Sequence, residues 1–439
     1  MSRRLPAGLV RDPVRVCEIL VGLPDVNVLG VLDADEVLQI HVECHDGIVA
    51  CPDCDIRAHL KDQRPVDLVD LPCLGRPTVL VWHKRRWRCP NPGCERRSWS
   101  EEDTRIASPR LAMTNRAGRW ATAQVGRLGR TVNEVAKELR CDWHTLNDTV
   151  IAYGEMLVDD PDRVAEVIAL GLDETLFCRR GRWRRQEFAT SIVDVTPGRP
   201  ARLLDVVEGR TAAGPSGWIA AQSPAWRARV AWGVLDLSGP YRKTFDDVLP
   251  DATQVADPFH VCKLANQKLD ECRRRVQNET LGHRGRKTDP LYRARRLLTK
   301  AHERLDEKGE TKLLGLLAAG DPHGEVRDTW NAKEATRGIY DIGDAELAEE
   351  YVCELATDMQ DHSNPPEVRS LGRTLARWFE QITAWHKGLV TNGPTEANNL
   401  IKRIKRIGFG FRSFAHYRIR VLLYAGRPDW SLLDSAVPR

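Results

Sequence analysis

The chain of 439 residues has no long apolar run and no apolar core close to its first residue. A membrane-spanning helix needs roughly 20 mostly apolar residues in a row, so we expect no such helix and no membrane partner. The opening stretch, MSRRLPAGLVRDP, lacks the apolar segment of a secretion signal. These absences predict a cytoplasmic protein.

The chain also lacks a strong net charge, because 66 basic residues are almost balanced by 62 acidic ones and leave +4. The total therefore says little about partners, but the distribution is informative. Basic residues gather in 83–88, 179–185 and 402–406. Separate basic patches are typical of a protein that contacts a polyanion at several places, although an arginine-rich surface gives the same pattern.

Twelve cysteines in a cytoplasmic chain favour metal ligands or core thiols over disulfides. Two pairs lie on turns rich in proline and glycine, one in CPDC and one in CPNPGC. Four thiolates from such pairs can surround one Zn²⁺ tetrahedrally. The segment between the pairs reads as two strands. We therefore predict a small, treble-clef or ribbon-like β module with a structural zinc bound by Cys51, Cys54, Cys89 and Cys94.

The basic segment HKRRWR runs directly into the second cysteine pair. Basic and aromatic residues on a strand beside a zinc site suit contact with nucleic-acid phosphates. A solvated edge strand protected by its charges is the alternative. The candidate DNA contacts here are Lys84, Arg85, Arg86 and Arg88.

Residues 131–153 predict two helices joined by a short turn. Thr131 and Glu134 have the spacing of a capping box, and Asp142 can cap the second helix. Polar residues at the start of the second helix are typical of a helix-turn-helix that reads DNA, and any helical hairpin is the alternative. We expect the residues that point outward toward DNA to be Trp143, His144 and Asn147.

Residues 161–260 alternate between apolar strand patterns and helix patterns in the order β-β-β-α-β-α-β, which is that of an RNase H-like fold. Asp173 falls in the first strand and Asp236 at the end of the fourth, and these positions are neighbours in that topology. Adjacent carboxylates repel unless a divalent cation neutralises them. Asp257 follows the fifth strand and precedes Pro-Phe-His260.

Residues 261–390 have helical periodicity almost throughout, with breaks at 282–289, 320–324 and 363–366. We expect a helical insertion. Trp330 lies near Lys333 and Arg337 and is a candidate for stacking on an unpaired DNA base. The alternative is a core position, which is the more common place for a tryptophan at helical spacing.

The stretch 391–424 predicts a helix that begins near Pro394 and carries a carboxylate, Glu396, one or two turns before a basic face. A metal-binding carboxylate beside cations that hold phosphate is one interpretation, and an amphipathic surface helix is the other. The candidate DNA contacts in this helix are Asn399, Lys402, Arg403, Lys405 and Arg406.

Three segments, GLDETLF, DPFHVCKLAN and TNGPTEANNLIKRIKRIGFGFRSFAHYRIRVLL, resemble DDE-type transposases of bacterial insertion sequences, in particular the ISL3 family. The resemblance covers nearly the whole chain. It implies that Asp173 is the first catalytic carboxylate and Glu396 the last. For the second, strand order favours Asp236, while the Asp257-x-x-His260 element resembles a motif that follows the second aspartate in related transposases. We expect Asp236 to bind metal, with Asp257 and His260 in support.

The resemblance implies a multidomain α+β protein in the bacterial cytoplasm, at the nucleoid. We expect a zinc module over 1–105, a helix-turn-helix over 106–160, an RNase H-like α/β core over 161–260, an all-helical insertion over 261–390 and the final part of the core over 391–439. Expected cofactors are Mg²⁺ or Mn²⁺ at the catalytic site and a structural Zn²⁺. Expected partners are double-stranded transposon-end and target DNA and, because two ends must be paired, at least a homodimer.

Two other functions fit the same residues. One is a catalytically silent, sequence-specific DNA-binding protein derived from a transposase. The other is an RNase H-like nuclease without strand transfer. The presence of all three expected carboxylates argues against the first, and the helical insertion argues against the second.

Overall fold

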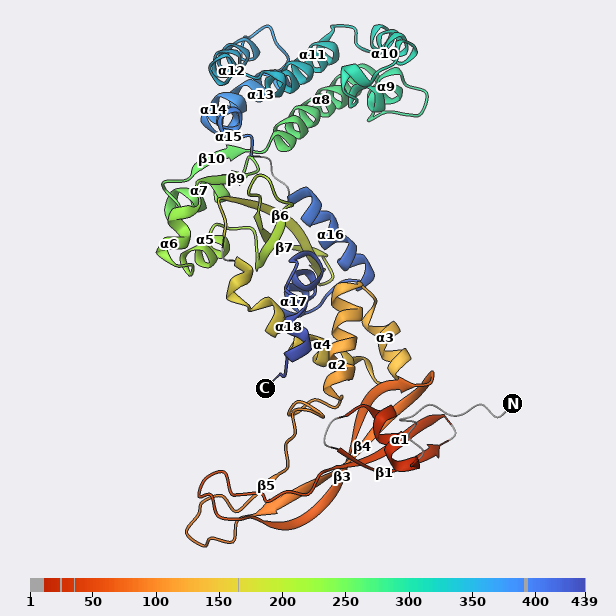
Figure 1. Ribbon diagram of the computed structural model, residues 1–439. Coiled ribbons are helices and arrows are strands. Elements are labelled where there is room, and N and C mark those ends of the chain that lie inside the picture. Colours follow the sequence, from red (N-terminus) through yellow and green to blue (C-terminus); the bar gives the residue numbers. More distant parts are fainter. Residues whose placement is uncertain (1–11, 24–25, 35, 165, 391–393, 439) are drawn as a thin grey trace, which may run out of the picture. The chain divides into compact units, whose positions relative to one another are not determined.

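The computed structural model describes residues 12–438 apart from 24–25, 35, 165 and 391–393, and it leaves the side chains of 14 and 394–398 undescribed. The chain is mixed α/β, with two sheets and many helices (Figure 1). It divides into two compact units, of which the first combines Met1–Arg163 with Leu400–Arg439 and the second is Val164–Asn399. None of the helices that are described has the length and apolar character needed to span a membrane.

The first unit begins with helix α1 (Pro13–Val21) and a sheet in the order β1-β2-β4-β3, with β5 also paired to β4. Strand β4 pairs with β3 in antiparallel fashion along most of its length, and on its other side with β2 in parallel over Thr78–Trp82 and with β5 over Arg86–Arg88. The second half of HKRRWR therefore has a strand on both sides and is not a free edge. Alternate side chains of these strands, such as Val42 and Leu80, are fully buried and form the core of the sheet. The strands are β1 (Val26–Ala34), β2 (Val37–Cys44), β3 (His59–Cys73), β4 (Arg76–Arg88) and β5 (Ser98–Ser100).

Helices α3 (Val132–Leu139) and α4 (Trp143–Val158) start where the sequence predicts. The side chain of Thr131 accepts from the backbone N–H of Glu134, and the Glu134 carboxylate accepts from that of Thr131, which confirms the capping box. Asp142 caps α4 by accepting from Thr145. Arg140, with φ of 56°, makes the left-handed turn between the two helices. Before them come α2 (Asn115–Thr122) and a π-helical turn (Ala123–Arg127).

The last helices complete this unit although they are far away in the sequence. Helix α17 (Phe414–Ala425) packs against α4. A Cβ on Gly154 of α4 would lie 2.6 Å from Cγ2 of Ile419 on α17, so this position requires glycine. Helix α16 (Pro394–Ile407) contains the boundary between the two units, and α18 (Leu432–Ser435) ends the chain.

The second unit contains a five-stranded sheet in the order β10-β9-β6-β7-β8. The first three strands in sequence are antiparallel neighbours, and the last two run parallel to the first. The predicted order of the strands along the chain is confirmed. Two details differ: the first strand extends beyond Asp173, and two short helices stand between the third and fourth strands where one was predicted. The elements are β6 (Ala169–Arg180), β7 (Arg185–Asp194), β8 (Arg202–Glu208), α5 (Ala213–Ala220), α6 (Pro224–Arg229), β9 (Trp232–Leu235), α7 (Gly239–Val248) and β10 (Thr253–Ala256).

The core of this sheet explains its sequence pattern. Strands β6 and β9 carry runs of buried apolar residues because both faces are covered, as is usual for parallel strands. Phe245 of α7 packs directly over Gly233 of β9, where an added Cβ would lie 2.6 Å from the phenyl ring. These contacts fix the carboxyl end of β9, and with it the position of Asp236.

Helices fill the rest of the second unit. They begin at α8, which leaves β10, and end at α15 (Figure 1). The breaks predicted at 282–289, 320–324 and 363–366 are confirmed. A second apolar cluster includes Leu291, Leu313 and Trp330. The helices are α8 (Pro258–Leu281), α9 (Pro290–Leu298), α10 (Glu307–Gly320), α11 (Glu325–Gly338), α12 (Ala345–Met359), α13 (Pro366–Arg377), α14 (Phe379–Thr383) and α15 (Trp385–Gly388), with single 3₁₀ turns at His302–Arg304 and Ile339–Asp341. One more 3₁₀ turn, Pro161–Val164, precedes β6.

Substitution of Thr131 by alanine should remove one arm of the capping box and leave a backbone donor of α3 without its partner. We expect a loss of about 1 kcal/mol in the free energy of unfolding of the first unit, measured by urea denaturation. Thr131→Ser keeps the hydroxyl and is the matched control. Equal stability of the alanine and serine variants would contradict the role given to this cap.

Candidate functional site

Strands β9 and β10 each end immediately before an aspartate, and β6, which runs on to Arg180, carries one at the corresponding position. Leu235 of β9 lies opposite Leu172 of β6 and Ala256 of β10. Side chains alternate between the two faces along a strand. The residue that follows each of these three apolar residues therefore points to the opposite face of the sheet. Those next residues are Asp173, Asp236 and Asp257.

Asp257 begins α8 and holds His260. One oxygen of Asp257 accepts from the backbone N–H of Phe259 at 3.3 Å, which caps the helix. The other lies 2.9 Å from Nδ1 of His260. Asp257 is 3 % exposed. Because Nδ1 is engaged, Nε2 is the ring nitrogen of His260 that remains for another partner.

Asp173, Asp236 and His260 form a compact cluster. Each offers one ligand atom, and these atoms all lie within 4.8 Å of one another. One carboxylate oxygen of Asp236 is buried without a hydrogen-bond partner among the described residues. Two carboxylates and an imidazole, with a carboxylate oxygen left unpaired, fit a divalent cation such as Mg²⁺ or Mn²⁺.

The pKa values in the cluster are shifted by partial burial and by the neighbouring charges. Burial raises the pKa of Asp236 to about 6; the charge of His260 opposes this shift and that of Asp173 adds to it. Burial likewise raises the pKa of Asp173. Burial alone would lower the pKa of His260, but the hydrogen bond to Asp257 and the nearby carboxylates raise it overall. A positive charge at this place is therefore stabilising.

The structure thus brings together Asp173, Asp236 and His260 and sets Asp257 behind His260. The side chain of Glu396 lies outside the described residues. Sequence reasoning overlooked Lys263, an exposed residue one helical turn after His260 whose charge lowers the pKa of both Asp173 and Asp236. Its spacing of three from His260 was the available signal.

The four predicted cysteines form a second cluster. Their sulfur atoms all lie within 4.8 Å of one another, with 3.8 Å from Cys51 to Cys94 and 3.6 Å from Cys54 to Cys89. A tetrahedral site with Zn–S bonds of about 2.3 Å requires sulfur atoms about 3.8 Å apart. The arrangement therefore fits zinc and is too wide for a disulfide.

The thiols of this cluster differ in acidity. The pKa of Cys54 is lowered to about 7, mainly by the backbone N–H of Ile56. Burial raises the pKa of Cys94 to about 12 and also raises that of Cys89. A bound cation would favour the thiolate forms of Cys89 and Cys94, as is usual where a metal deprotonates its ligands.

The basic strand β4 is less open than predicted. Arg85 is 6 % exposed and donates to the carbonyl of Cys44 at 2.7 Å, while it pairs with Asp46 at 3.0 Å. Its expected role as a DNA contact is replaced by a structural one, because its guanidinium ties β4 to the end of β2. Arg86 pairs with Asp62 at 3.3 Å, and Arg88 is exposed.

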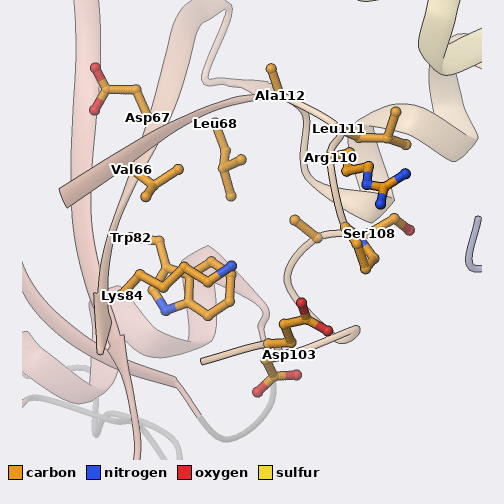
Figure 2. A pocket seen from close by; sticks show the side chains of 13 residues that line it. Val66, Asp67, Leu68, Trp82, Lys84, Asp103, Ser108, Arg110, Leu111 and Ala112 are labelled. Atoms are coloured by element: carbon orange, nitrogen blue, oxygen red, sulfur yellow. The ribbon is translucent and has the colours of Figure 1, made fainter. Parts of the chain in front are cut away.

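Lys84 lies beside an indole ring in a small pocket. Its Nζ is 4.6 Å from the centre of the Trp82 ring. Figure 2 shows both side chains facing Asp103 and Ser108 across a cavity of about 290 Å³. Lys84 is half-buried and shares this pocket with Asp103, whereas Arg88 is exposed.

The start of α4 presents two of its three predicted DNA contacts. Trp143 is 42 % exposed and His144 is exposed. Asn147 is 3 % exposed, and its Nδ2 lies 3.4 Å from Nδ1 of His416 on α17. The expectation that Asn147 points outward is therefore wrong, because α17 covers this face of α4.

Trp330 is a core residue. It is 7 % exposed, lies in the second apolar cluster and makes an edge contact with His302. It has no face open for stacking on a base, so that prediction is wrong. In α16, by contrast, Asn399, Lys402, Arg403 and Arg406 are exposed, and Lys405 is half-buried.

Residues 170–421 match the family profile of ISL3-type DDE transposases, which carries the description "Transposase". The match covers more than half of the chain, so the chain belongs to this family of insertion-sequence transposases, proteins of DNA recombination.

Curated relatives agree. The chain is 25 % identical over 362 residues to the transposase for insertion sequence element IS1557 of Mycobacterium tuberculosis, which covers 75 % of this chain and 79 % of the relative. It is 24 % identical over 412 residues to the transposase for insertion sequence element IS1001 of Bordetella parapertussis, which covers 89 % and 92 %.

Asp236→Asn should stabilise the metal-free protein at neutral pH. A pKa moved from 3.8 to about 6 in the folded state means that the native carboxyl keeps its proton while the unfolded one ionises, so stability falls as pH rises between these values. Removing that charge should add about 2–3 kcal/mol at pH 7 in EDTA, measured by urea denaturation, and the gain should disappear below about pH 4.

Mn²⁺ should stabilise the wild-type protein and not Asp236→Asn. The exposed Asp251 lies in the same unit outside the cluster, and Asp251→Asn serves as the control with neither effect. An Asp236→Asn variant that is less stable than wild type in EDTA at pH 7 would refute the repulsion between the carboxylates.

Cys51→Ser should release bound zinc and unfold the β module that holds the cysteines, because the small group of buried side chains around them contributes little without metal. Metal analysis and circular dichroism measure both effects. Cys73, at the end of β3 and outside the cluster, gives the matched control Cys73→Ser, which should keep its zinc. A zinc-free Cys51→Ser protein with unchanged structure would contradict this role.

Proposed function

We propose that this protein binds the terminal inverted repeats of its insertion sequence, cleaves the transposon ends and joins the resulting 3′-OH to target DNA. Membership of the transposase family supports DNA cleavage and transfer. The observation that carries the proposed mechanism is the pair of aspartates, Asp173 and Asp236, on neighbouring strands with a buried oxygen left unpaired.

The fold of the second unit supports the proposal. Three antiparallel strands followed by two strands parallel to the first, in the order β8-β7-β6-β9-β10, are consistent with an RNase H-like core. The long helical stretch from α8 to α15 then interrupts that core before α16, as the resemblance implies. In the first unit, α3 and α4 with their tight turn are consistent with a helix-turn-helix.

Asp173 and Asp236 would hold the catalytic metal, with Glu396 as the third carboxylate implied by the resemblance. A divalent ion bound there supplies activation of the attacking water or 3′-hydroxyl and neutralisation of charge on the phosphodiester. The oxygen-rich site suits Mg²⁺ or Mn²⁺.

His260 and Lys263 complete the site from α8. Asp257 fixes the ring of His260 through Nδ1, so that Nε2 is presented to the cluster or to a phosphate oxygen. Lys263 adds a positive charge on the same helix face, where it attracts the phosphate backbone. Asp257 is in this scheme a positioning residue.

DNA recognition is assigned to exposed groups of the first unit and of α16. These are Arg88 beside the zinc cluster, Trp143 and His144 at the start of α4, and the basic face of α16 that includes Lys402, Arg403 and Arg406. The zinc module would position the basic strand. Because both transposon ends must be held at once, the active form would be at least a homodimer, working at the nucleoid of the bacterial cytoplasm.

A cleavage and strand-transfer assay on DNA that carries the element's ends, with Mg²⁺ or Mn²⁺, tests the mechanism. We expect Asp173→Asn and Asp236→Asn to lose both cutting and joining while they still bind the ends. Asp257→Asn should keep some activity, reduced about 10–100-fold, because it acts through His260. Asp251→Asn, outside the cluster, should behave like wild type.

The products separate the alternatives. Joined products support a transposase, cut but unjoined ends support a nuclease, and binding without cutting supports a silent DNA-binding protein. Full loss in Asp257→Asn together with an active Asp236→Asn would transfer the second metal ligand to Asp257 and overturn the assignment.

A further inference from the structure

A pocket of about 630 Å³ lies inside the first unit, between the start of the α3–α4 pair and the loop that joins α16 to α17. Its volume is in the range of small-ligand sites. Helix α4 contributes Trp143 and His144, the loop contributes Phe409, and α17 contributes His416 and Arg420. Neither the catalytic cluster nor the zinc cluster uses these groups.

Arg420 is the unusual member of this lining. It is only 3 % exposed, and its Nε and Nη2 atoms have no hydrogen-bond partner among the described residues. Burial lowers the pKa of its guanidinium to about 10, which leaves it charged at neutral pH. A buried charge is costly unless it is paired. Arg420 would therefore be stabilised by an anionic partner, and the described part of the chain does not supply one.

The surroundings of Arg420 favour an anion from outside. The described residues that line the pocket include Arg412, His144 and His416 and contain no aspartate or glutamate. Ser413, which also lines the pocket, caps the twelve-residue helix α17, and the start of a helix favours negative charge. The ionisable side chains that line the pocket are therefore all bases.

Aromatic side chains stand beside this positive centre. Trp143 is 42 % exposed and Phe409 is 95 % exposed. Phe409 has φ of 50° and is followed by Gly410 with φ of 93°, so the loop holds a large apolar ring in a left-handed conformation that such residues rarely adopt. Backbone of this kind is typical of ligand-contact sites, and an exposed ring gives a planar ligand a stacking surface.

We propose that this pocket binds a nucleotide unit of DNA, with its phosphate paired to Arg420 and its base or sugar against Trp143 and Phe409. The inference rests on the proposed DNA-binding function and adds a defined site to it. The guanidinium offers two donors to a phosphate, a geometry that suits arginine better than lysine. The phosphate would come from bound DNA, and a free nucleotide is the other source of the same chemistry.

Thermal unfolding of the full-length protein tests the anion site without DNA. Inorganic phosphate and deoxythymidine monophosphate should raise the melting temperature of wild type, and thymidine, which has no phosphate, should not. Arg420→Met should lose the shift and be at least as stable as wild type without ligand, because an unpaired buried charge is gone. No phosphate-dependent shift in wild type would overturn the site.

Two further variants keep the test decisive. Arg418 lies on the same helix, pairs with Asp159 and does not line the pocket, so Arg418→Gln should keep the phosphate shift. Trp143→Ala changes an exposed side chain and should keep the shift with inorganic phosphate while it weakens the shift with the mononucleotide. If Arg420→Met fails to fold, equal mononucleotide shifts in Trp143→Ala and wild type still contradict the proposed orientation.

Fluorescence anisotropy with end DNA identifies the source of the phosphate. Arg420→Met should bind this DNA at least about tenfold more weakly than wild type, the loss expected for a charged hydrogen bond, and Arg418→Gln should lose much less. Unchanged DNA affinity in Arg420→Met, with the phosphate shift intact in wild type, would assign the pocket to free nucleotides. If wild type binds no end DNA and still responds to phosphate, the proposed function fails while the anion site stands.

Discussion

The second unit is organised around like charges placed where they repel. The parallel strands β9 and β10 each end immediately before an aspartate, and their neighbour β6 carries Asp173 at the same level of the sheet. Burial, with the nearby charge of Asp173, raises the pKa of Asp236 to about 6, so the ionised form of this carboxyl is destabilised in the protein alone. Of the three aspartates, Asp257 is compensated by the helix start and by His260. Asp173 and Asp236 lie side by side, and one oxygen of Asp236 is buried without a hydrogen-bond partner among the described residues, which is the physical reason to assign a cation to this edge.

Much of this arrangement was predictable because it depends on local patterns. Buried parallel strands read as apolar runs, and their ends are marked by aspartates, so the strand order and the neighbourhood of Asp173 and Asp236 follow from the sequence. Between Asp236 and Asp257, the sequence favoured Asp236 on strand order alone. Both aspartates come directly after a strand, and only the position of His260 decides which one is covered by a histidine and which has an oxygen left open.

The predictions that failed share one cause, which is burial by segments distant in sequence. Asn147 has the spacing of an outward residue on an isolated α4, but α17, some 270 positions later, covers it. Arg85 sits in a basic run typical of a DNA contact, yet its guanidinium serves the end of β2. Trp330 carries neighbouring charges, yet packs into a helical core. A sequence pattern gives the periodicity of a helix or strand. It does not show which of its faces is buried by a segment that is distant in the sequence.

The burial of Arg420 could not be predicted from the sequence for the same reason. Its importance is clear when it is compared with the aspartate cluster. Its place in the run RIRVLLY put an arginine on the apolar side of α17, which was a signal, but a lone arginine in a helix is usually satisfied by a nearby carboxylate. Here the described lining offers none. Leaving one buried charge unpaired costs several kcal/mol, comparable to much of the net stability of a domain. One unit holds two neighbouring aspartates with a buried unpaired oxygen on Asp236, and the other holds a buried arginine with two unpaired nitrogens. Such a fold is expected to be most stable with ligands of opposite sign bound: a metal ion at the aspartates and a phosphate at the arginine. DNA with its divalent counterions supplies both chemistries, so binding of substrate and stability of the protein are expected to be coupled.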